Sequence, residues 1–553
     1  MNFTKQVNNA NIFYNKITEL YSKLPLCDEQ KIKFLSHISE YAWNWHTGRF
    51  TSRFIENECI KIATSFAQPN SPSGIEESEV VVFVATELYE TGGHTRLLEN
   101  YAEYLSKKKF IIKLIITRQN DNQVPQRIKG SKLFRDIICL LDNNCTEGIN
   151  TIREISSCAS YIFNFQHPDD TLLITALNYS NRPYTYYVNH ADHVFWLGIS
   201  ASDAILNLRP YSQSLTETRR NAKLAKHILP VRLNLERKYP EKAASRIALG
   251  LDPDAVVFVI VSALWKIFPD LNYNIYEIIA EILKLDKRIV VLMVGSTSED
   301  YKNFSGNDKP ERVKCYGVQS DTAIYLAAAD YYLEGMPSSS LTALMEGIAA
   351  GIYPFLIWGP YHPNMRNDNE FYIQGVVTHP FSKDRYLDRI CRIVQNPPVE
   401  ELRAAIQEMK SNMKYFSSDE YWDGIFNFGI RKDRADGYLP LEPEFQNLLY
   451  DQRVAEQASL LYGMNRINPY YSIISKLYSS GLINGYQAWR IWILFGLKFS
   501  GISRLSIKSS YSLLLTLLPK PKTYIKRLYF NLGDENIIKS TYRKFKENLI
   551  KNK

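Results

Sequence analysis

Residues 312–360 read RVKCYGVQSDTAIYLAAADYYLEGMPSSSLTALMEGIAAGIYPFLIWGP, and this stretch decides the fold. The apolar runs RVKCYG (312–317), DYYLEGMP (330–337) and IYPFLIWG (352–359) predict strands, with helices expected between them. Apolar runs without polar alternation are typical of strands buried on both faces, which occur in parallel sheets covered by helices. The stretch therefore predicts part of a doubly wound α/β domain.

The alternation of predicted strands and helices continues on the N-terminal side of this stretch. AVVFVIVSAL (255–264) and RIVVLMVGS (288–296) predict two further strands, with a helix around residues 272–285 between them. We therefore predict that a Rossmann-like domain covers residues 241–415.

An earlier series predicts a first domain of the same kind. VVVFVA (80–85) and FIIKLII (110–116) indicate buried strands joined by a loop and a helix. We place this domain at residues 76–240, so the predicted fold class is α/β with two tandem Rossmann-like doubly wound domains. Further strands of the first domain are expected at residues 135–141, 159–164 and 184–189.

Helical extensions are expected at both ends of the chain. In residues 1–75 apolar side chains recur at helical spacing without strand-like alternation, which predicts a helical N-terminal extension. Residues 416–553 are predicted to form a helical, basic and amphipathic C-terminal region.

Chemistry is expected in the loops after the strands, because parallel sheets bind ligands beyond the carboxyl ends of their strands. One unusual loop is TGGHTR (91–96), where Gly93 lets the backbone approach a ligand and the helix start offers N–H groups to an anion. The loop is not GxGxxG, so the nicotinamide and flavin fingerprint is absent. A plain strand-to-helix turn is the alternative interpretation.

Two further loops carry candidate phosphate ligands. Lys266 follows the predicted strand at 255–264, where a lysine can neutralise a phosphate as a point charge, although a surface lysine is the alternative. Ser339 and Ser340 open the helix of the quoted stretch and offer hydroxyl and N–H groups, although serine is also a common N-cap. Glu346, on about the same helix face as Ser339, is either a ligand for ribose hydroxyls or a solvated carboxylate.

The segment NHADHVFW (189–196) places two histidines beside a carboxylate after a predicted strand of the first domain. This set lacks the further ligand that a metal site needs, so we expect no metal. A base with a pKa near neutral is suited to deprotonating an acceptor hydroxyl. We take His94, His190 and Asp192 as candidate catalytic residues and His193 as a further candidate, with structural hydrogen bonding as the alternative for each histidine.

In order and spacing, residues 80–415 resemble the GT-B glycosyltransferases, both the retaining family 4 group and the inverting group that includes the N-acetylglucosaminyltransferase of peptidoglycan synthesis. The quoted stretch is similar to their donor-domain signature: strand, Gly, short helix, Ala-Asp, strand, Pro-Ser, a Glu within a helix, and Ala-Gly-hydrophobic-Pro. The resemblance implies an enzyme that transfers a sugar from a nucleotide-diphosphate sugar to an acceptor hydroxyl. It also implies that the active site needs no metal or other cofactor.

The resemblance assigns roles to particular residues. Lys266 is expected to bind the donor diphosphate and Glu346 the ribose. Gly93 and His94 fall on the loop that faces the donor phosphates and the acceptor. The donor-binding set implied by the resemblance is Gly93, Lys266, Gly317, Val318, Ser339, Ser340 and Glu346, with Gly317 and Val318 beside the nucleotide base.

The chain departs from the retaining pattern at one position. The paired acids of the retaining family, a Glu followed eight positions later by a second, would need Glu at 338, and this chain has Ser338. The stereochemical outcome is therefore left open.

The expected acceptor is a lipid-linked or cell-envelope polysaccharide. One alternative is a cytoplasmic protein glycosyltransferase of the adhesin-modifying kind, whose helical N-terminal region has a parallel in residues 1–68. Another is a non-catalytic GT-B-like subunit that chaperones or recruits a partner enzyme, which multiple-turnover transfer by the isolated chain would exclude. A GT-B-like sugar-nucleotide epimerase is a further hypothesis.

Positive charge is concentrated at the C-terminus. Residues 501–553 hold twelve Lys or Arg against three Asp or Glu, a local net charge of +9, while the whole chain carries +8. Basic segments with aromatic and aliphatic groups bind anionic lipid at about 1 kcal/mol per basic residue. We expect residues 486–553 to contact an anionic membrane, and we expect no nucleic acid because no nucleic-acid-binding module accompanies them. A helical subdomain with an aromatic core is the alternative.

Composition agrees with a cytoplasmic protein on the inner face of a membrane. The 553 residues are 45% hydrophobic and 22% charged, which excludes collagen-like, coiled-coil and wholly disordered classes. Seven scattered Cys without a CxxC pair predict neither a zinc ribbon nor a disulfide framework. We find no secretory signal and no apolar run of the roughly 18 to 20 residues that a spanning helix requires.

Deleting residues 501–553 is expected to release the protein from anionic liposomes, because it removes twelve of the fourteen Lys and Arg in residues 486–553. Co-sedimentation with vesicles of anionic and of neutral lipid measures this. Unchanged binding to the anionic vesicles would contradict the membrane role and favour a core role for the segment.

Overall fold

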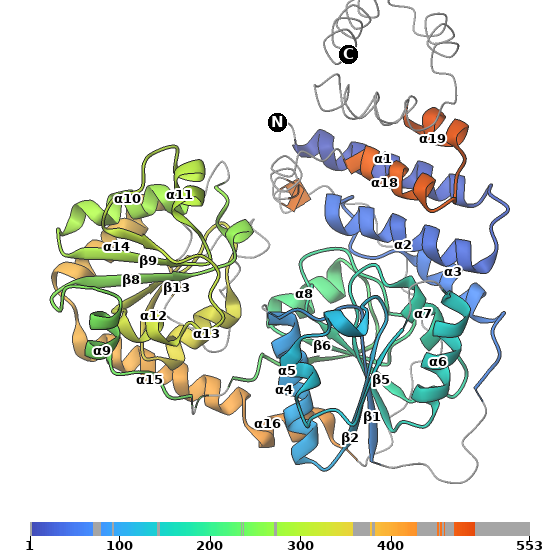
Figure 1. Ribbon diagram of the computed structural model, residues 1–553, viewed down its shortest axis with the longest axis horizontal. Helices are drawn as coiled ribbons and strands as arrows, with labels where there is room; N and C mark the ends of the chain where they lie inside the picture. The colour runs from blue at the N-terminus through green and yellow to red at the C-terminus, as the bar shows by residue number, and fades with distance from the viewer. Residues whose placement is uncertain are drawn as a thin grey trace, which may run out of the picture. The chain divides into compact units, whose positions relative to one another are not determined.

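A computed structural model of the chain describes residues 3–69, 79–90, 93–140, 144–233, 235, 237–269, 274–357, 377–378, 382–428, 451–452, 454–455, 458 and 469–492. The chain forms two compact units, residues 1–461 and 462–553. The first unit contains both β-sheets and the helices that cover them (Figure 1).

The first sheet has seven parallel strands in the order β3-β2-β1-β4-β5-β6-β7. All six residues of the central run VVVFVA, β1, are buried because helices cover both faces of the sheet (Figure 1). Chain order reverses between β1 and β4, which makes this point the topological switch point of the sheet. The strands are β1 (Val80–Ala85), β2 (Ile111–Ile116), β3 (Asp136–Cys139), β4 (Tyr161–Phe165), β5 (Tyr184–Asn189), β6 (Ala204–Asn207) and β7 (Ala225–Ile228).

Side-chain caps fix where two of the crossover helices begin. Asn144 accepts a hydrogen bond from the backbone N–H of Glu147 at the start of α6, and Asp170 does the same for Leu173 at the start of α7. The helices and turns of this domain are α4 (Gly93–Lys107), η1 (Asp121–Gln123), α5 (Gln126–Lys129), α6 (Cys145–Ser157), α7 (Thr171–Leu177) and α8 (Pro210–Thr218).

The second sheet repeats the design with six parallel strands in the order β10-β9-β8-β11-β12-β13. Its strands are β8 (Val256–Val261), β9 (Ile289–Val294), β10 (Val313–Cys315), β11 (Tyr331–Leu333), β12 (Tyr353–Ile357) and β13 (Val377–Thr378). Its helices are α9 (Lys242–Ala248), η2 (Leu264–Ile267), α10 (Ile275–Leu285), α11 (Ser298–Ser305), α12 (Ala323–Ala328), α13 (Leu341–Ala349) and α14 (Lys383–Gln395).

The predicted fold class is confirmed by these two sheet orders, which give the chain a GT-B-like architecture. The strands expected at 135–141, 159–164 and 184–189 correspond to β3, β4 and β5. The sequence did not predict β6 and β7, because AILN and AKHI are only four residues long and do not stand out as apolar runs.

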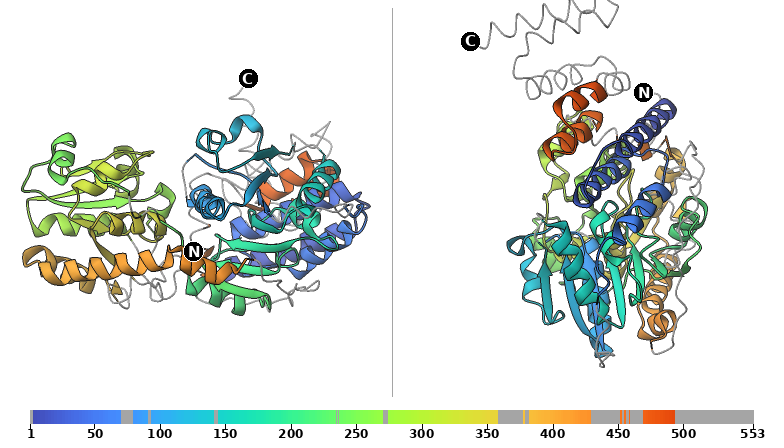
Figure 2. Two further views of the ribbon diagram at one scale, coloured as in Figure 1. Left: turned by 90° about the horizontal axis from the view of Figure 1, so that it is seen from below. Right: turned by 90° about the vertical axis from the view of Figure 1, so that its right-hand side faces the viewer.

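The expected N-terminal helices form, and they are built into the first domain. They are α1 (Phe3–Tyr21), α2 (Asp28–Trp45) and α3 (Arg53–Ala63), and both α2 and α3 pack against α7 (Figures 1 and 2). α1 packs against α2, and apolar side chains at helical spacing are buried in all three helices, among them Phe13, Leu35 and Ile55.

Glu56 of α3 is the polar centre of this packing. Its buried carboxylate accepts hydrogen bonds from the backbone N–H groups of Gly198 (2.6 Å), Ile199 (3.1 Å) and Ser200 (3.1 Å), and from the Ser200 hydroxyl. These residues belong to the loop between β5 and β6, whose own N–H groups have no ladder partners there. The N-terminal helices therefore hold one of the loops that follow the strands.

The chain returns to the first domain after the second sheet. α15 (Val399–Phe416) packs against α13 and β12, and α16 (Asp419–Phe426) then packs against α4 (Figure 2). The fully buried ring of Trp422 lies 4.8 Å from that of Tyr101 and 5.0 Å from that of Tyr104. The region predicted as a C-terminal extension from residue 416 thus begins with a helix that completes the core of the first domain.

The second unit contains two described helices, α18 (Pro469–Ser479) and α19 (Gly485–Ile491). The basic segment 501–553, and all but the first seven residues of the expected membrane-binding region 486–553, lie outside the described residues. Among the helices that the structure describes, none combines the length and the apolar character that crossing a membrane requires.

Replacing Glu56 with Ala is expected to lower the free energy of unfolding by about 3 kcal/mol or more, because each buried N–H that loses its acceptor costs about 1 to 3 kcal/mol. Guanidinium-induced unfolding measures the change. Glu29→Ala, which removes a half-exposed carboxylate of α2, is the matched control and should change stability by less than about 0.5 kcal/mol. Equal effects of the two substitutions would contradict the role of Glu56.

Candidate functional site

The carboxyl ends of strands from both sheets line one pocket of about 620 Å³. Residues that follow β1, β5 and β6 line it from the first domain, and residues that follow β8, β9, β10 and β11 line it from the second. Every residue that the sequence predicted for the site lines this pocket except Gly317. The predicted residues brought together are Gly93, His94, His190, Asp192, Lys266, Val318, Ser339, Ser340 and Glu346.

Two helices begin at this pocket. A Cβ atom on Gly93, the first residue of α4, would lie 3.4 Å from the hydroxyl of Thr342 in the first turn of α13, so the two helix starts approach closely. Free N–H groups at a helix start favour bound anions. Thr91 and Gly92, the first residues of the predicted glycine-rich loop, lie outside the described residues.

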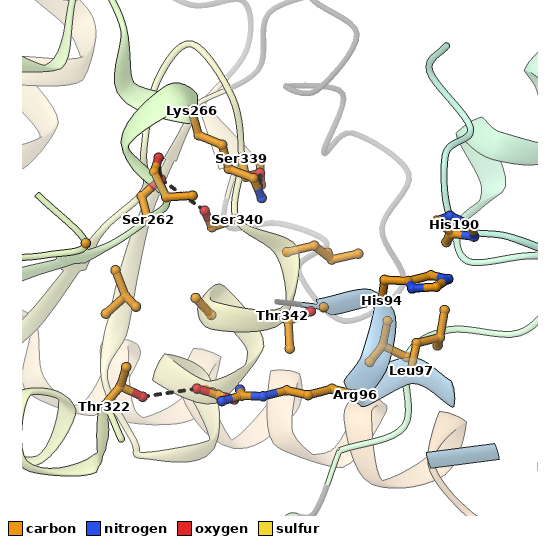
Figure 3. A pocket seen from close by; sticks show the side chains of 18 of the residues that line it. His94, Arg96, Leu97, His190, Ser262, Lys266, Thr322, Ser339, Ser340 and Thr342 are labelled. Atoms are coloured by element: carbon orange, nitrogen blue, oxygen red, sulfur yellow. Dashed lines mark hydrogen bonds and ion pairs between the residues drawn. The ribbon is translucent and has the colours of Figure 1, made fainter. Parts of the chain in front are cut away.

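The start of α13 is arranged so that its first turn stays open. Ser340 is the N-cap residue, but its side chain makes no cap hydrogen bond within the described structure. Its hydroxyl instead lies 3.1 Å from the hydroxyl of Ser262 (Figure 3). Its N–H donates to Glu334 Oε1 at 2.6 Å. The N–H groups of the following turn are therefore available to an anion in the pocket.

Lys266 of η2 forms hydrogen bonds with the segment that precedes α13. Its Nζ donates to the carbonyl of Ser339 at 3.2 Å, and its own carbonyl accepts from the N–H of Ser338 at 3.0 Å (Figure 3). Burial lowers the pKa of Lys266, and the nearby Glu334 carboxylate opposes that shift. Within the described part of the chain Lys266 forms no direct ion pair, although the buried Glu334 carboxylate lies near enough to act on its charge.

Glu334 is a site residue that the sequence did not single out. It follows β11, is 1% exposed, and supports the Ser338–Ser340 turn from behind the pocket wall through its bond to Ser340. Burial raises the pKa of Glu334 to about 7, against the opposing effects of the Ser340 N–H and Lys266. Its sequence signal is a carboxylate directly after a strand, in LEGMP.

Glu346 joins the two domains across the pocket. Its Oε1 accepts from Arg96 Nη1 of α4 at 2.5 Å, and its Oε2 accepts from the Thr322 hydroxyl at 3.2 Å (Figure 3). A ribose hydroxyl at Glu346 would share these oxygens with Arg96 and Thr322. Arg96 was not predicted, because its partner lies 250 residues away in the sequence.

His94 and His190 lie side by side on the wall formed by the first domain, with ring centroids 4.3 Å apart (Figure 3). His94 Nε2 lies 2.9 Å from the carbonyl of Phe165, and His190 Nδ1 lies 3.2 Å from the carbonyl of Val188. Since a carbonyl only accepts, these nitrogens carry the protons, which leaves His94 Nδ1 and His190 Nε2 as acceptors.

Both histidines are neutral at pH 7. Burial lowers the pKa of His94 to about 4, and burial together with the neighbouring His94 holds the pKa of His190 well below its usual range. His167 completes a cluster, with its ring centroid 5.4 Å from that of His94 and its pKa lowered by burial to about 3. The sequence signal for His167 is its place in NFQHPDD after a predicted strand.

Asp192 lines the pocket, but its oxygens are already engaged. Arg209 donates to both of them, at 2.7 and 3.2 Å, and His193 and the Ser212 hydroxyl donate as well. Although burial acts in the opposite direction, Arg209 and His193 hold the pKa of Asp192 well below its usual range. A carboxylate with so low a pKa is a weak base, so the arrangement suits Asp192 to positioning Arg209 and His193.

Gly317, assigned to the nucleotide base by resemblance, lies behind the pocket surface in the left-handed backbone conformation (φ 65°). Its N–H donates to Ser296 at 2.8 Å, and its carbonyl accepts from Gly295 at 2.7 Å. The next residue, Val318, is 75% exposed and lines the pocket. Among the residues that the structure describes, no three His, Cys, Asp or Glu side chains are grouped so as to hold a metal ion.

No protein-family model matches the chain, and no curated protein sequence matches it. Among solved structures, sucrose-phosphate synthase from Thermosynechococcus elongatus is similar, at 13% identity and a TM-score of 0.47 over 63% of this chain and 98% of that chain. A glycosyltransferase from Rickettsia africae ESF-5 is similar at 15% identity and a TM-score of 0.49, over 64% of this chain and 98% of that one. HepE from Anabaena, in complex with UDP and glucose, is similar at 12% identity and a TM-score of 0.46, over 63% and 98%. At these identities the likeness concerns the fold alone.

The folded protein is expected to lose stability as the pH falls from about 6.5 toward 4. Because the pKa of His94 is about 4 when folded and near 6.5 when unfolded, protons bind the unfolded chain first in this window. His94 alone should cost about 1 to 2 kcal/mol of unfolding free energy at pH 5 relative to pH 7. Chemical denaturation at both pH values measures this difference.

His94→Gln should reduce the loss between pH 7 and pH 5 by that amount. His227→Gln is the control, because β7 carries no member of the histidine cluster, and it should leave the loss unchanged. An unchanged pH dependence in His94→Gln would show that His94 is not held neutral in the folded state.

Proposed function

We propose that this protein is a glycosyltransferase that transfers a sugar from a nucleotide-diphosphate sugar to an acceptor hydroxyl. The observation that carries the proposal is one pocket with two complementary walls. One wall has a lysine without a direct ion pair among the described residues and the open start of α13, and the other has paired neutral histidines.

The wall of the second domain is suited to a diphosphate. Lys266 supplies a positive charge, the first turn of α13 supplies N–H groups, and the hydroxyls of Ser339 and Ser340 add donors at the same place. Such groups stabilise the charge that develops on the leaving diphosphate as the bond from the sugar carbon to its phosphate oxygen breaks. The same wall includes the exposed side chain of Val318, which is suited to contact the base, and Glu346, which is suited to bind the ribose.

The wall of the first domain is suited to removing a proton. His190 Nε2 is the acceptor nitrogen of a neutral imidazole, and its Nδ1–H is fixed on the Val188 carbonyl. As the acceptor oxygen forms its bond to the sugar, this nitrogen takes the hydroxyl proton. His94 packs against the His190 ring and fixes its orientation, while Asp192 stays ionised and holds Arg209.

We propose that the acceptor is a lipid-linked or cell-envelope glycan, reached at the inner face of the membrane. The support is the basic and aromatic composition of residues 486–553, which suits an anionic lipid surface. Transfer to a polypeptide is the second hypothesis, and a comparison of glycan and peptide acceptors separates the two.

Lys266→Ala is expected to weaken donor binding by about 10- to 150-fold and to abolish sugar transfer, because a charge-assisted hydrogen bond contributes about 1.5 to 3 kcal/mol. Nucleotide release from UDP-, GDP-, ADP- and dTDP-sugars, with and without membrane lipid, measures the effect. CMP-sugars, which lack the diphosphate, provide a comparison.

Lys287→Ala removes an exposed lysine after α10 and is the matched control, with full activity expected. Full activity of Lys266→Ala would overturn the placement of the diphosphate. If the parent chain releases no nucleotide from any donor and binds no nucleotide, the hypothesis of a non-catalytic subunit is favoured.

A further inference from the structure

A second cavity, of about 230 Å³, lies at the carboxyl edge of the first sheet. It is lined by residues that follow β2, β3 and β4, by the starts of α6 and α7, and by one face of α2. Of the two strands at the topological switch point, β1 and β4, the residues after β4 line the cavity, so it lies beside the place where doubly wound sheets bind ligands. This second cavity shares no lining residue with the pocket of about 620 Å³ described above, which we call the donor pocket.

Two buried polar atoms in its walls lack hydrogen-bond partners among the described residues. Arg118 donates to Asp169 Oδ2 at 2.8 Å, which leaves Arg118 Nη2 and Asp169 Oδ1 unpaired. Asp169 is 2% exposed, and burial raises its pKa against the effect of Arg118. Leaving such groups unpaired costs about 1 to 3 kcal/mol each, so a ligand that both donates and accepts hydrogen bonds is favoured here.

The charges around the cavity disfavour an anion. Its lining has three carboxylates, Glu40, Asp169 and Asp170, against two cationic side chains, Lys33 and Arg118. A phosphate or carboxylate would meet net negative charge, whereas a neutral polyol would meet alternating donors and acceptors.

The cavity also has an apolar side of limited size. Ile32, Leu140 and Leu172 line it, and a Cβ atom added to Gly148 would lie 3.6 to 3.8 Å from the two leucines. A volume of about 230 Å³ is below the range of about 300 to 1,000 Å³ that is typical of sites for drug-sized ligands. It therefore suits a single ring with one polar edge and one apolar face.

His167 lies near Arg118 of this cavity and packs against His94, which lines the larger pocket. Tyr89, which is 45% exposed, stacks on His167 at 5.9 Å between centroids, and His167 contacts His94 at 5.4 Å. Arg118 of the second cavity also lowers the pKa of His167 through its charge, after the larger effects of burial and His94, so it lies close to that ring. Exposed aromatic rings provide flat, amphipathic surfaces on which a sugar ring can pack.

We propose that the second cavity is a subsite for one neutral sugar residue of a glycan acceptor. Asp169 and Arg118 bind its hydroxyls, Leu140 and Leu172 contact its apolar face, and Tyr89 supports the chain between the subsite and His190. This assignment of an acceptor role rests on the proposed transferase function, but sugar binding in the cavity can be measured without it.

The test is saturation-transfer NMR on the full chain with methyl glycosides of glucose, galactose, mannose and N-acetylglucosamine. At least one glycoside is expected to bind. Gly148→Leu, which fills the cavity at a helical position where the new Cβ has room, should weaken that binding at least tenfold. Asp169→Asn should weaken it as well, without adding volume.

Gly424→Leu is the matched control, because a Cβ at that position of α16 meets open space, and it should bind like the parent. Binding lost in Lys266→Ala but retained in Gly148→Leu would place the sugar in the donor pocket and overturn the inference. Failure of every glycoside to bind would also overturn it, and binding of a dipeptide panel in their place would assign the cavity to a polypeptide acceptor.

The two proposals fail separately. A protein that releases nucleotide from a donor but binds no glycoside in this cavity keeps the transferase function and loses the subsite. A protein that binds a glycoside here but no nucleotide keeps a sugar-binding cavity and loses the transferase function.

Discussion

Strands that are buried on both faces impose one constraint on which the rest of this structure depends. Here they are parallel and joined by helices that cross over a sheet face, so every strand-to-helix loop lies at the same edge. The seven-stranded and the six-stranded sheets both obey this constraint, and the loops at their carboxyl edges supply both cavities. Glu56, on a helix outside either sheet, stabilises a loop at the same edge, because it accepts hydrogen bonds from the β5–β6 loop.

Charge is distributed unequally within the pocket of about 620 Å³ that is lined from both sheets. Arg96 is paired with Glu346 and Arg209 with Asp192, while Lys266 faces the pocket without a carboxylate partner among the described residues. Burial keeps the histidines opposite neutral, and His94 and His167 lower the pKa of His190 further. The pocket thus offers positive charge at one wall and proton acceptors at the other, and these are the two features on which the proposed transfer depends.

Local sequence patterns sufficed for the α/β fold class, because buried strands followed by loops are recognisable from their neighbours. The same patterns placed Lys266 and Ser340 in loops that line the pocket, while their roles stay predictions. Contacts between distant segments could not be predicted in this way. Arg96 contacts Glu346 only because the two sheets lie together in the folded chain. His167 belongs to the histidine cluster because its ring packs against those of His94 and Tyr89. The short β6 and β7 and the second cavity under α2 have the same origin, since tertiary packing defines them.

The return of α16 has a consequence for how the protein can be divided. Trp422 fills the space beside Tyr101 and Tyr104, and Asp419 and Asp423 bind Arg232 and Lys108 of the first domain. The first domain is therefore assembled from two separate stretches of chain, with the second domain inserted between them. A single cut anywhere in the linker before β8 leaves the N-terminal fragment without part of its core, so the two domains cannot be produced as independent halves by one truncation.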